Sequence, residues 1–355
     1  MAGFRMMLDP AKTGPEALSL EENLRKRVVG QDHAVREIVD VYQTFVAGMS
    51  SPGRPAGSLL FLGPTGSGKT RTVEAVAEAL VGDTSAVVKI DCAEFQHSHE
   101  IAKLIGSPPG YLGHRETKAM LSQEALDQHH TDKVKLSFVL FDEIEKASDA
   151  LWNLLLGVLD KATLTLGDNR RVDFSDAIIF MTSNLGAAEM NALLQPKLGF
   201  AVQNAGTQSP EKLARAGTDA VRRRFTPEFV NRIDKMVVFN ALGEAELRQI
   251  VDLELASVED RIHGAIGANG IELADADSAK AYMLQQGIDA RYGARHLKRA
   301  IERLMVHPVS KLIATGQLQG NDRLLVEYDS TLARLVFMKE YQVTEPQADG
   351  LAAAA

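Results

Sequence analysis

Short runs of apolar residues alternate with longer amphipathic segments through the first two thirds of the chain. The apolar runs have the length of buried strands, and they cover residues 58–62, 86–90, 136–141 and 177–181. Segments between them, such as 69–80 and 150–159, carry apolar residues at helical spacing. Strands that alternate with helices in this way predict an α/β fold, in which a parallel sheet is flanked by helices on both faces.

The pattern changes after residue 239, where helical periodicity takes over. Helices are predicted over 244–266, 278–285 and 294–313, followed by strand-like segments at 323–327 and 332–337. We therefore place a domain boundary near Asn240. The expected organisation is a large nucleotide-binding domain with a short N-terminal extension over 1–240, a smaller, mainly helical C-terminal domain with a few strands over 241–340, and a tail over 341–355.

Composition narrows the class of protein. Hydrophobic residues make up 45% and charged residues 24%, which is ordinary globular usage. The net charge of −8 has the wrong sign for a general attraction to nucleic acid, so nucleic acid is a disfavoured partner. A single cysteine, Cys92, excludes an internal disulfide and fits a reducing compartment. No apolar run approaches the roughly 20 residues of a membrane span, and the first residues lack a signal peptide, so we expect a cytoplasmic protein without a membrane segment.

A glycine-rich motif, GPTGSGKT, lies between a predicted strand and a predicted helix. Gly63, Gly66 and Gly68 would let backbone N–H groups turn toward phosphates. Lys69 would supply charge to the β- and γ-phosphates, and Thr70 would present a hydroxyl to Mg²⁺. A glycine-rich turn that binds nothing is the alternative, but both flanks favour an ATP site. The predicted nucleotide-binding residues are Gly63, Pro64, Thr65, Gly66, Ser67, Gly68, Lys69 and Thr70.

Two adjacent acids follow the apolar run at 136–141. Ligands of open α/β sheets bind at the carboxyl ends of the strands, so we expect both acids there. Asp142 would hold Mg²⁺, and Glu143 would polarise the attacking water. Asn184 follows the next strand, but taken alone an asparagine in that place is more typical of a turn.

With these motifs in order, the chain resembles the AAA+ ATPases, and within them the C-terminal ATPase ring of the Clp protein-unfolding chaperones. The resemblance covers about residues 20–340. The stretches that carry it are RVVGQDHAV, GPTGSGKT, GSPPGYLG, VLFDEIEKA, LLLGVLD, RRVDFSDAIIFMTSNLGA, FTPEFVNRID and YGARHLKR. The resemblance implies adenine-pocket roles for Val28 and Val29, a sensor-1 role for Asn184 and a sensor-2 role for Arg295.

The same resemblance makes Arg232 the arginine finger, which in this family the neighbouring subunit supplies. It thus implies a ring of subunits, most simply a hexamer, with active sites at the interfaces. Apart from the resemblance, a structural salt bridge would be the better interpretation of Arg232, and an ordinary helix N-terminal arginine that of Arg295.

Two further segments match substrate- and partner-binding loops of the family. Tyr111 and Leu112 resemble the loop that lines the central pore and grips polypeptide, although residues 114–118 (HRETK) stand where relatives usually have a short acidic, glycine-containing stretch. The tripeptide Leu198, Gly199 and Phe200 resembles the loop by which protease-linked members dock onto a peptidase. Packing of this tripeptide onto its own domain is an equally good alternative.

The function expected from the resemblance is that of an ATP-dependent protein unfoldase or remodelling chaperone that threads polypeptide through a ring. ATP and Mg²⁺ are the expected substrate and cofactor, and ADP and phosphate the products. Two alternatives stay open: the ATPase regulatory subunit of a Clp-type peptidase, and an ATP-gated scaffold that assembles without threading.

Overall fold

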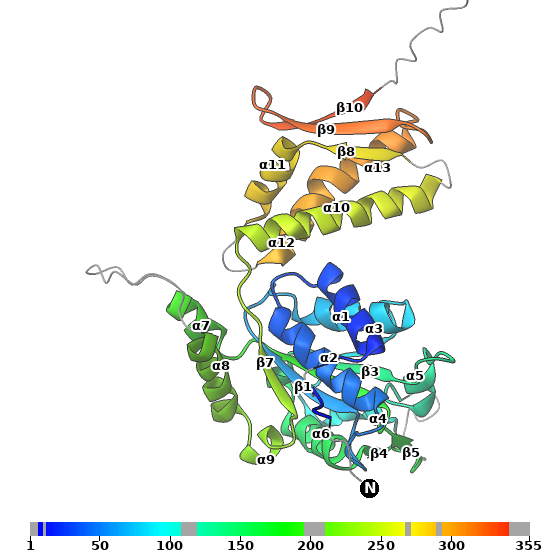
Figure 1. The fold of residues 1–355 in the computed structure, drawn as a ribbon, viewed down its shortest axis with the longest axis vertical. Helices are drawn as coiled ribbons and strands as arrows, with labels where there is room; N and C mark the ends of the chain where they lie inside the picture. Colours follow the sequence, from blue (N-terminus) through cyan, green and yellow to red (C-terminus); the bar gives the residue numbers. More distant parts are fainter. Residues whose placement is uncertain are drawn as a thin grey trace, which may run out of the picture. The chain divides into compact units, whose positions relative to one another are not determined.

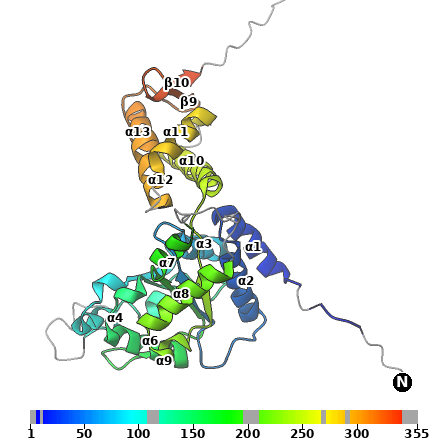
Figure 2. The same ribbon diagram turned by 90° about the vertical axis from the view of Figure 1, so that its left-hand side faces the viewer.

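The computed structural model of the protein describes residues 6–9, 12–107, 119–194, 210–266, 271–288 and 293–340. The chain divides into two compact units (Figures 1 and 2). The first comprises residues 1–242 with 291–293, and the second residues 243–290 with 294–355.

The first unit is built on a five-stranded sheet in the order β2-β3-β6-β1-β7, in which all neighbours are parallel. Its strands are β1 (Gly57–Leu62), β2 (Val87–Asp91), β3 (Ser137–Asp142), β6 (Ala177–Ser183) and β7 (Lys235–Val238). The four apolar runs of the sequence therefore form β1, β2, β3 and β6. The predicted α/β fold with a parallel sheet is confirmed.

Helices cover both faces of this sheet because its central strands are apolar on both sides. In β1, Leu59 and Phe61 pack into one core cluster, and Leu60 and Leu62 into the other. The first cluster includes residues of α1, α2 and α3, which lie together in Figure 1. The second includes residues of α6 and α8, and Figure 2 shows α7 beside α8. The helices of this unit are α1 (Pro15–Arg27), α2 (Asp32–Val46), α3 (Lys69–Val81), α4 (Ala102–Ile105), α5 (Gln123–Asp127), α6 (Asp149–Lys161), α7 (Ala187–Leu194), α8 (Pro210–Arg224) and α9 (Pro227–Val230).

Short elements complete the first unit. A two-stranded antiparallel ribbon, which the sequence did not predict, pairs β4 (Thr163–Thr165) with β5 (Arg171–Asp173). Three 3₁₀ turns are η1 (Cys92–Glu94), η2 (Ser98–Ile101) and η3 (Ile144–Lys146). The last of these follows β3 directly and carries part of the candidate site.

The second unit combines helices with a three-stranded sheet in the order β10-β9-β8, visible in Figure 1. Its strands are β8 (Glu272–Asp275), β9 (Arg323–Asp329) and β10 (Arg334–Glu340). Its helices are α10 (Glu244–Ile266), α11 (Asp277–Gly287), α12 (Ala294–Ile301) and α13 (His307–Ala314), with a π turn, η4 (Glu302–Val306), between the last two. The predicted mainly helical domain with a few strands is confirmed.

The π turn interrupts the run 294–313, which the sequence predicts as one helix. Pro308 lies in the first turn of α13. In an uninterrupted α-helix its ring would clash with the carbonyl of Leu304, and a wider turn relieves that clash. None of the helices in the described part of the chain combines the length and apolarity needed to span a membrane.

Candidate functional site

The loop between β1 and α3 has the backbone of an anion cradle. Gly63, Gly66 and Gly68 adopt positive φ angles of 148°, 78° and 97°. Gly68 is the N-cap of α3 and offers no side-chain cap, so the first N–H groups of the helix are left for another acceptor. A helix N-terminus of this kind favours phosphate through both its N–H groups and its dipole.

Lys69 is the first residue of α3, and its ammonium group is buried in the loop. Its Nζ donates to the carbonyl oxygens of Gly63 at 2.7 Å and Pro64 at 3.0 Å, and to Oδ1 of Asn184 at 3.0 Å. Beside it, the hydroxyl of Ser67 is buried and has no hydrogen-bond partner among the described residues. A buried cation and an unpaired hydroxyl in a glycine cradle fit a polyphosphate, whose oxygens can satisfy both.

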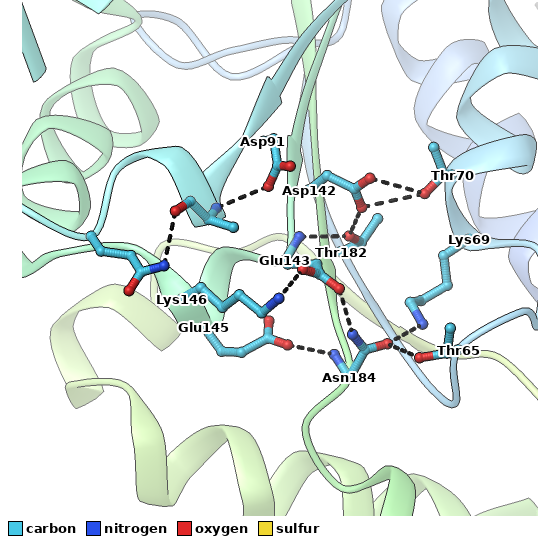
Figure 3. Close-up of polar contacts among 12 residues, drawn as sticks. Thr65, Lys69, Thr70, Asp91, Asp142, Glu143, Glu145, Lys146, Thr182 and Asn184 are labelled. Carbon is cyan, nitrogen blue, oxygen red and sulfur yellow. Dashed lines mark hydrogen bonds and ion pairs between the residues drawn. The ribbon is translucent and has the colours of Figure 1, made fainter. Parts of the chain in front are cut away.

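Asp142 ends β3 and faces the same loop (Figure 3). Both of its carboxylate oxygens lie 3.3 Å from the hydroxyl of Thr70, and the hydroxyl of Thr182 donates to one of them. Carboxylate and hydroxyl oxygens suit Mg²⁺, which usually keeps several waters and binds one or two protein carboxylates with substrate phosphates. No group of three His, Cys, Asp or Glu residues gathers as a metal cage within the described ranges.

Glu143 follows in a left-handed backbone conformation, with φ 57°. Its N–H donates to the Thr182 hydroxyl at 3.0 Å. Oε1 accepts from Nδ2 of Asn184 at 3.1 Å, and Oε2 forms an ion pair with Lys146. The hydrogen bond that Lys146 donates to Glu143, together with the negative charge of Glu143, raises the pKa of Lys146 above its usual range. Both carboxylate oxygens are therefore engaged.

Asn184 connects the two halves of the site because β6 lies between β3 and β1. Its Oδ1 accepts from Lys69 and lies 3.4 Å from the Thr65 hydroxyl, while its Nδ2 donates to Glu143. Its backbone N–H donates to Oε1 of Glu145 at 3.0 Å. The amide thus bridges the phosphate loop and the carboxylate, as Figure 3 shows.

Sequence reasoning missed a buried glutamine, Gln31, that hydrogen-bonds the backbone of the phosphate loop. Nε2 of Gln31 donates to the carbonyls of Ser67 at 3.1 Å and Asn240 at 3.0 Å, and its Oε1 accepts from the Asn240 N–H at 3.0 Å. The motif RVVGQDHAV contains this residue. The same motif places the half-buried Val28 and Val29 directly after α1.

Thr182, Glu145 and Lys146 were also missed as members of the site. Thr182 is a buried polar residue that follows the apolar residues 177–181 of β6, which is a usable signal for a polar partner. Glu145 and Lys146 lie in an acidic turn, and nothing in their spacing indicates which residues they contact.

Arg232 lies at the amino end of β1, away from the loop at its carboxyl end. Its carbonyl accepts from the hydroxyl of Ser58 at 3.2 Å. Its guanidinium pairs with Asp160 at 3.4 Å and Glu228 at 3.1 Å. A six-residue parallel strand spans about 20 Å, so Arg232 does not serve the phosphate loop of its own chain.

The other predicted residues fall elsewhere. Arg295 is an exposed residue in the first turn of α12, in the second unit. Tyr111 and Leu112 lie outside the described residues, as do Leu198, Gly199 and Phe200.

Two family profiles match the chain in sequence. That of the AAA domain (Cdc48 subfamily) matches residues 54–236, more than half of the chain. The chain belongs to the AAA family of ATPases. That of the C-terminal, D2-small domain of ClpB protein matches residues 242–326, which confirms the resemblance of this AAA module to the Clp chaperones.

Curated relatives of this AAA module include chaperones and a protease subunit. The chaperone protein ClpB of Bdellovibrio bacteriovorus is 40% identical over 313 residues, which are 87% of this chain and 34% of that protein. The ATP-dependent Clp protease ATP-binding subunit ClpC of Staphylococcus aureus is 38% identical over 315 residues, 88% of this chain and 36% of that protein. The chain thus spans about a third of the length of these relatives.

A solved structure shares the fold across most of the chain. A closed-state cryo-EM reconstruction of Hsp104 with ATPγS and FITC casein superposes with a TM-score of 0.73 and 29% identity. The match covers 91% of this chain and 52% of that one. This AAA module is therefore homologous to the matching parts of ClpB and ClpC and shares its fold with Hsp104.

Proposed function

We propose that this chain binds ATP with Mg²⁺ and hydrolyses it to ADP and phosphate at the site around Lys69 and Glu143. The observation that carries the proposal is the convergence of the phosphate loop, Asp142, Glu143 and Asn184 at the carboxyl ends of three adjacent parallel strands. Phosphoryl transfer requires a cation for the phosphates, carboxylates for metal and water, and a polar group that orients the reactants. Lys69, the two acids and Asn184 are groups of these kinds.

Each residue has a role that follows from its contacts. The N–H groups of residues 63 and 65–70 would cradle the phosphates, and Lys69 would exchange its carbonyl partners for β- and γ-phosphate oxygens. Thr70 and Asp142 would hold Mg²⁺, which screens phosphate charge when bound. Glu143 would polarise the attacking water, and Asn184 would orient that water or the γ-phosphate. Val28 and Val29 would contact adenine, and Arg295 would act as the sensor of the small domain.

Arg232 would complete a neighbouring site rather than its own. An arginine that neutralises charge on a transferring phosphoryl group accelerates the reaction by about 10³ to 10⁵. Because Arg232 lies at the other end of β1 from its own phosphate loop, this contribution requires a second copy of the chain. We infer a closed ring, most simply a hexamer, in which every interface contains one ATP site.

The cycle would drive unfolding or remodelling of protein substrates, with Tyr111 and Leu112 gripping polypeptide in the pore. Homology to the chaperone ClpB and the likeness to Hsp104, which was solved with casein, support this function. In this proposal residues 1–240 form the AAA+ large domain, 241–340 the small domain and 341–355 a tail.

The Glu143→Gln variant tests the proposed hydrolysis and assembly together. We expect it to bind ATP, to lose at least 100-fold in turnover, on the order of the loss from removing a general base, and to accumulate as rings in native mass measurement. A measurable turnover equal to that of the wild-type protein would overturn the role of Glu143. Turnover at the background rate in both proteins would overturn the ATPase and favour the ATP-gated scaffold.

Threading needs its own test, because hydrolysis alone does not move a polypeptide. Tyr111→Ala should abolish ATP-dependent unfolding of a tagged fluorescent protein and retain ATP hydrolysis. Tyr111→Phe is the matched control, since it keeps the aromatic ring. Unfolding at the wild-type rate in Tyr111→Ala would eliminate threading through this loop.

A second candidate function is regulation of a Clp-type peptidase. The similarity to ClpC, a Clp protease ATP-binding subunit, favours it. Deletion of residues 198–200 should then abolish stimulation of a co-encoded barrel peptidase while ATP hydrolysis continues. Absence of stimulation by the intact chain would remove this candidate.

A further inference from the structure

The carboxylate of Glu143 is held from two sides. Oε1 accepts from Nδ2 of Asn184 at 3.1 Å, and Oε2 is ion-paired with Lys146, three residues later in η3 (Figure 3). A carboxylate that polarises water must offer a lone pair toward that water. An ammonium group paired with one carboxylate oxygen occupies a lone pair, which is then not available to the water.

Lys146 is not needed to shape the turn that carries it. The turn is fixed by other groups: the indole N–H of Trp152 donates to the Ile144 carbonyl at 3.0 Å, and Arg224 donates to the Glu145 carbonyl at 2.9 Å. Glu145 in turn accepts the backbone N–H of Asn184. The side chain of Lys146 is half exposed, with 47% of its surface accessible.

The charges around Lys146 explain why it stays on Glu143. Asp91, Glu143 and Glu145 all act on its ammonium group, and Glu143 is the one in contact. Because three carboxylates surround the ammonium group, moving Lys146 into solvent would give little gain in free energy. Because the pair is partly exposed, it can also open at modest cost.

From this geometry we infer that Lys146 restrains Glu143 between turnovers, so that the Lys146–Glu143 ion pair must open before the carboxylate can polarise water. Lys146 is thus a positioning residue, and the ion pair keeps kcat below the value that the same site would reach without it. The inference rests on the proposed ATPase function of Glu143.

The test compares steady-state ATP hydrolysis by three variants of the full chain. Lys146→Met removes the ion pair and should raise kcat by about two- to fivefold, the factor that corresponds to an exposed ion pair. Lys146→Arg keeps a cation and should stay near the wild-type kcat. Lys89→Met is the charge-matched control, because the ion pairs of Lys89 are with Asp142 at 3.9 Å and Glu74 at 4.0 Å and not with Glu143. This variant should give no rise in kcat.

The outcomes separate the restraint from the proposed function. A kcat of Lys146→Met that equals or falls below the wild-type value would overturn the restraint, as would an equal rise in Lys89→Met. A merely structural role for Lys146 would lower kcat together with the thermal unfolding midpoint. If wild-type turnover is insensitive to Glu143→Gln, the proposed function itself fails, and that result is visible before any Lys146 variant is measured.

Discussion

Arg224 lies over the face of Trp152, with its guanidinium carbon 4.5 Å from the ring centroid. The same guanidinium donates to the carbonyl of Glu145 at 2.9 Å. Trp152 also makes an edge-type contact with Phe225, with ring centroids 5.1 Å apart, and Phe225 stacks on Phe229 of α9 at the same distance. A continuous path of contacts therefore joins the helix before Arg232 to the turn after Glu143.

Substitution of Arg224 by lysine should weaken this path. Lysine keeps the charge but loses the planar stacking and the forked donors, so we expect the free energy of unfolding to fall by about 0.5–1 kcal/mol. Urea unfolding followed by tryptophan fluorescence measures this directly, because Trp152 is the single tryptophan. Arg222→Lys, an exposed position on the same helix, is the matched control. Equal stabilities of the two variants would contradict an energetic role for the stacking.

Mixed assemblies should reveal whether Arg232 acts across subunits. Arg232→Ala should lower turnover by about 10³ or more with ATP binding retained, since binding depends on the loop of the same chain. A mixture with Glu143→Gln, in which each variant supplies the group that the other lacks, should recover part of the activity in a coupled ADP-release assay. Mixed rings that form without any recovery would refute action in trans. Arg232→Lys separates loss of the finger from loss of the ion pairs to Asp160 and Glu228.

Loss of the buried Gln31 amide should loosen the phosphate loop. Gln31→Leu leaves the Ser67 carbonyl and both backbone groups of Asn240 without a partner, which should cost about 1–3 kcal/mol in unfolding free energy or more. Gln31→Glu keeps the acceptor for the Asn240 N–H and removes only the donated bonds. Thermal unfolding and ATP titration in a Glu143→Gln background should place the glutamate variant between the wild-type protein and the leucine variant. The reverse order would show that burying the charge of the introduced glutamate costs more than its hydrogen bond from the Asn240 N–H contributes.

The single cysteine should be inert in the native protein. Burial, and then the negative charge of Asp142, raise the pKa of the Cys92 thiol far above its usual range, so the reactive thiolate is scarce throughout the neutral range. A chromogenic disulfide reagent at pH 8 should label no thiol in the folded chain and one in guanidinium. Rapid labelling without denaturant would mean that the region around Cys92 opens readily.

The sheet was predictable because each central strand is a short, uninterrupted apolar run that only a two-sided core explains. The phosphate loop, Asp142 and Glu143 were predictable because their chemistry is local in sequence and tied to strand ends. Gln31 was not, because its partner Asn240 lies 209 positions away and no local pattern specifies that pairing. The π turn was missed for another reason: periodicity continues through it, and Pro308 alone signals the break.

The side-chain contacts of the run at 222–224 could not be predicted either. The sequence shows only three adjacent arginines there. In the structure Arg223 pairs with Glu189 at 3.0 Å, whereas the guanidinium of Arg224 lies over the ring of Trp152. The contacts of Arg223 and Arg224 differ because α6, which carries Trp152, lies beside Arg224 of α8.

The left-handed backbone of Glu143 implies a conflict between durability and chemistry. A residue with a Cβ atom at φ 57° costs about 1–2 kcal/mol relative to an ordinary conformation, a cost that glycine avoids and asparagine reduces. The fold therefore carries a local conformational cost at the position that places this carboxylate on the amide of Asn184, next to the phosphate loop.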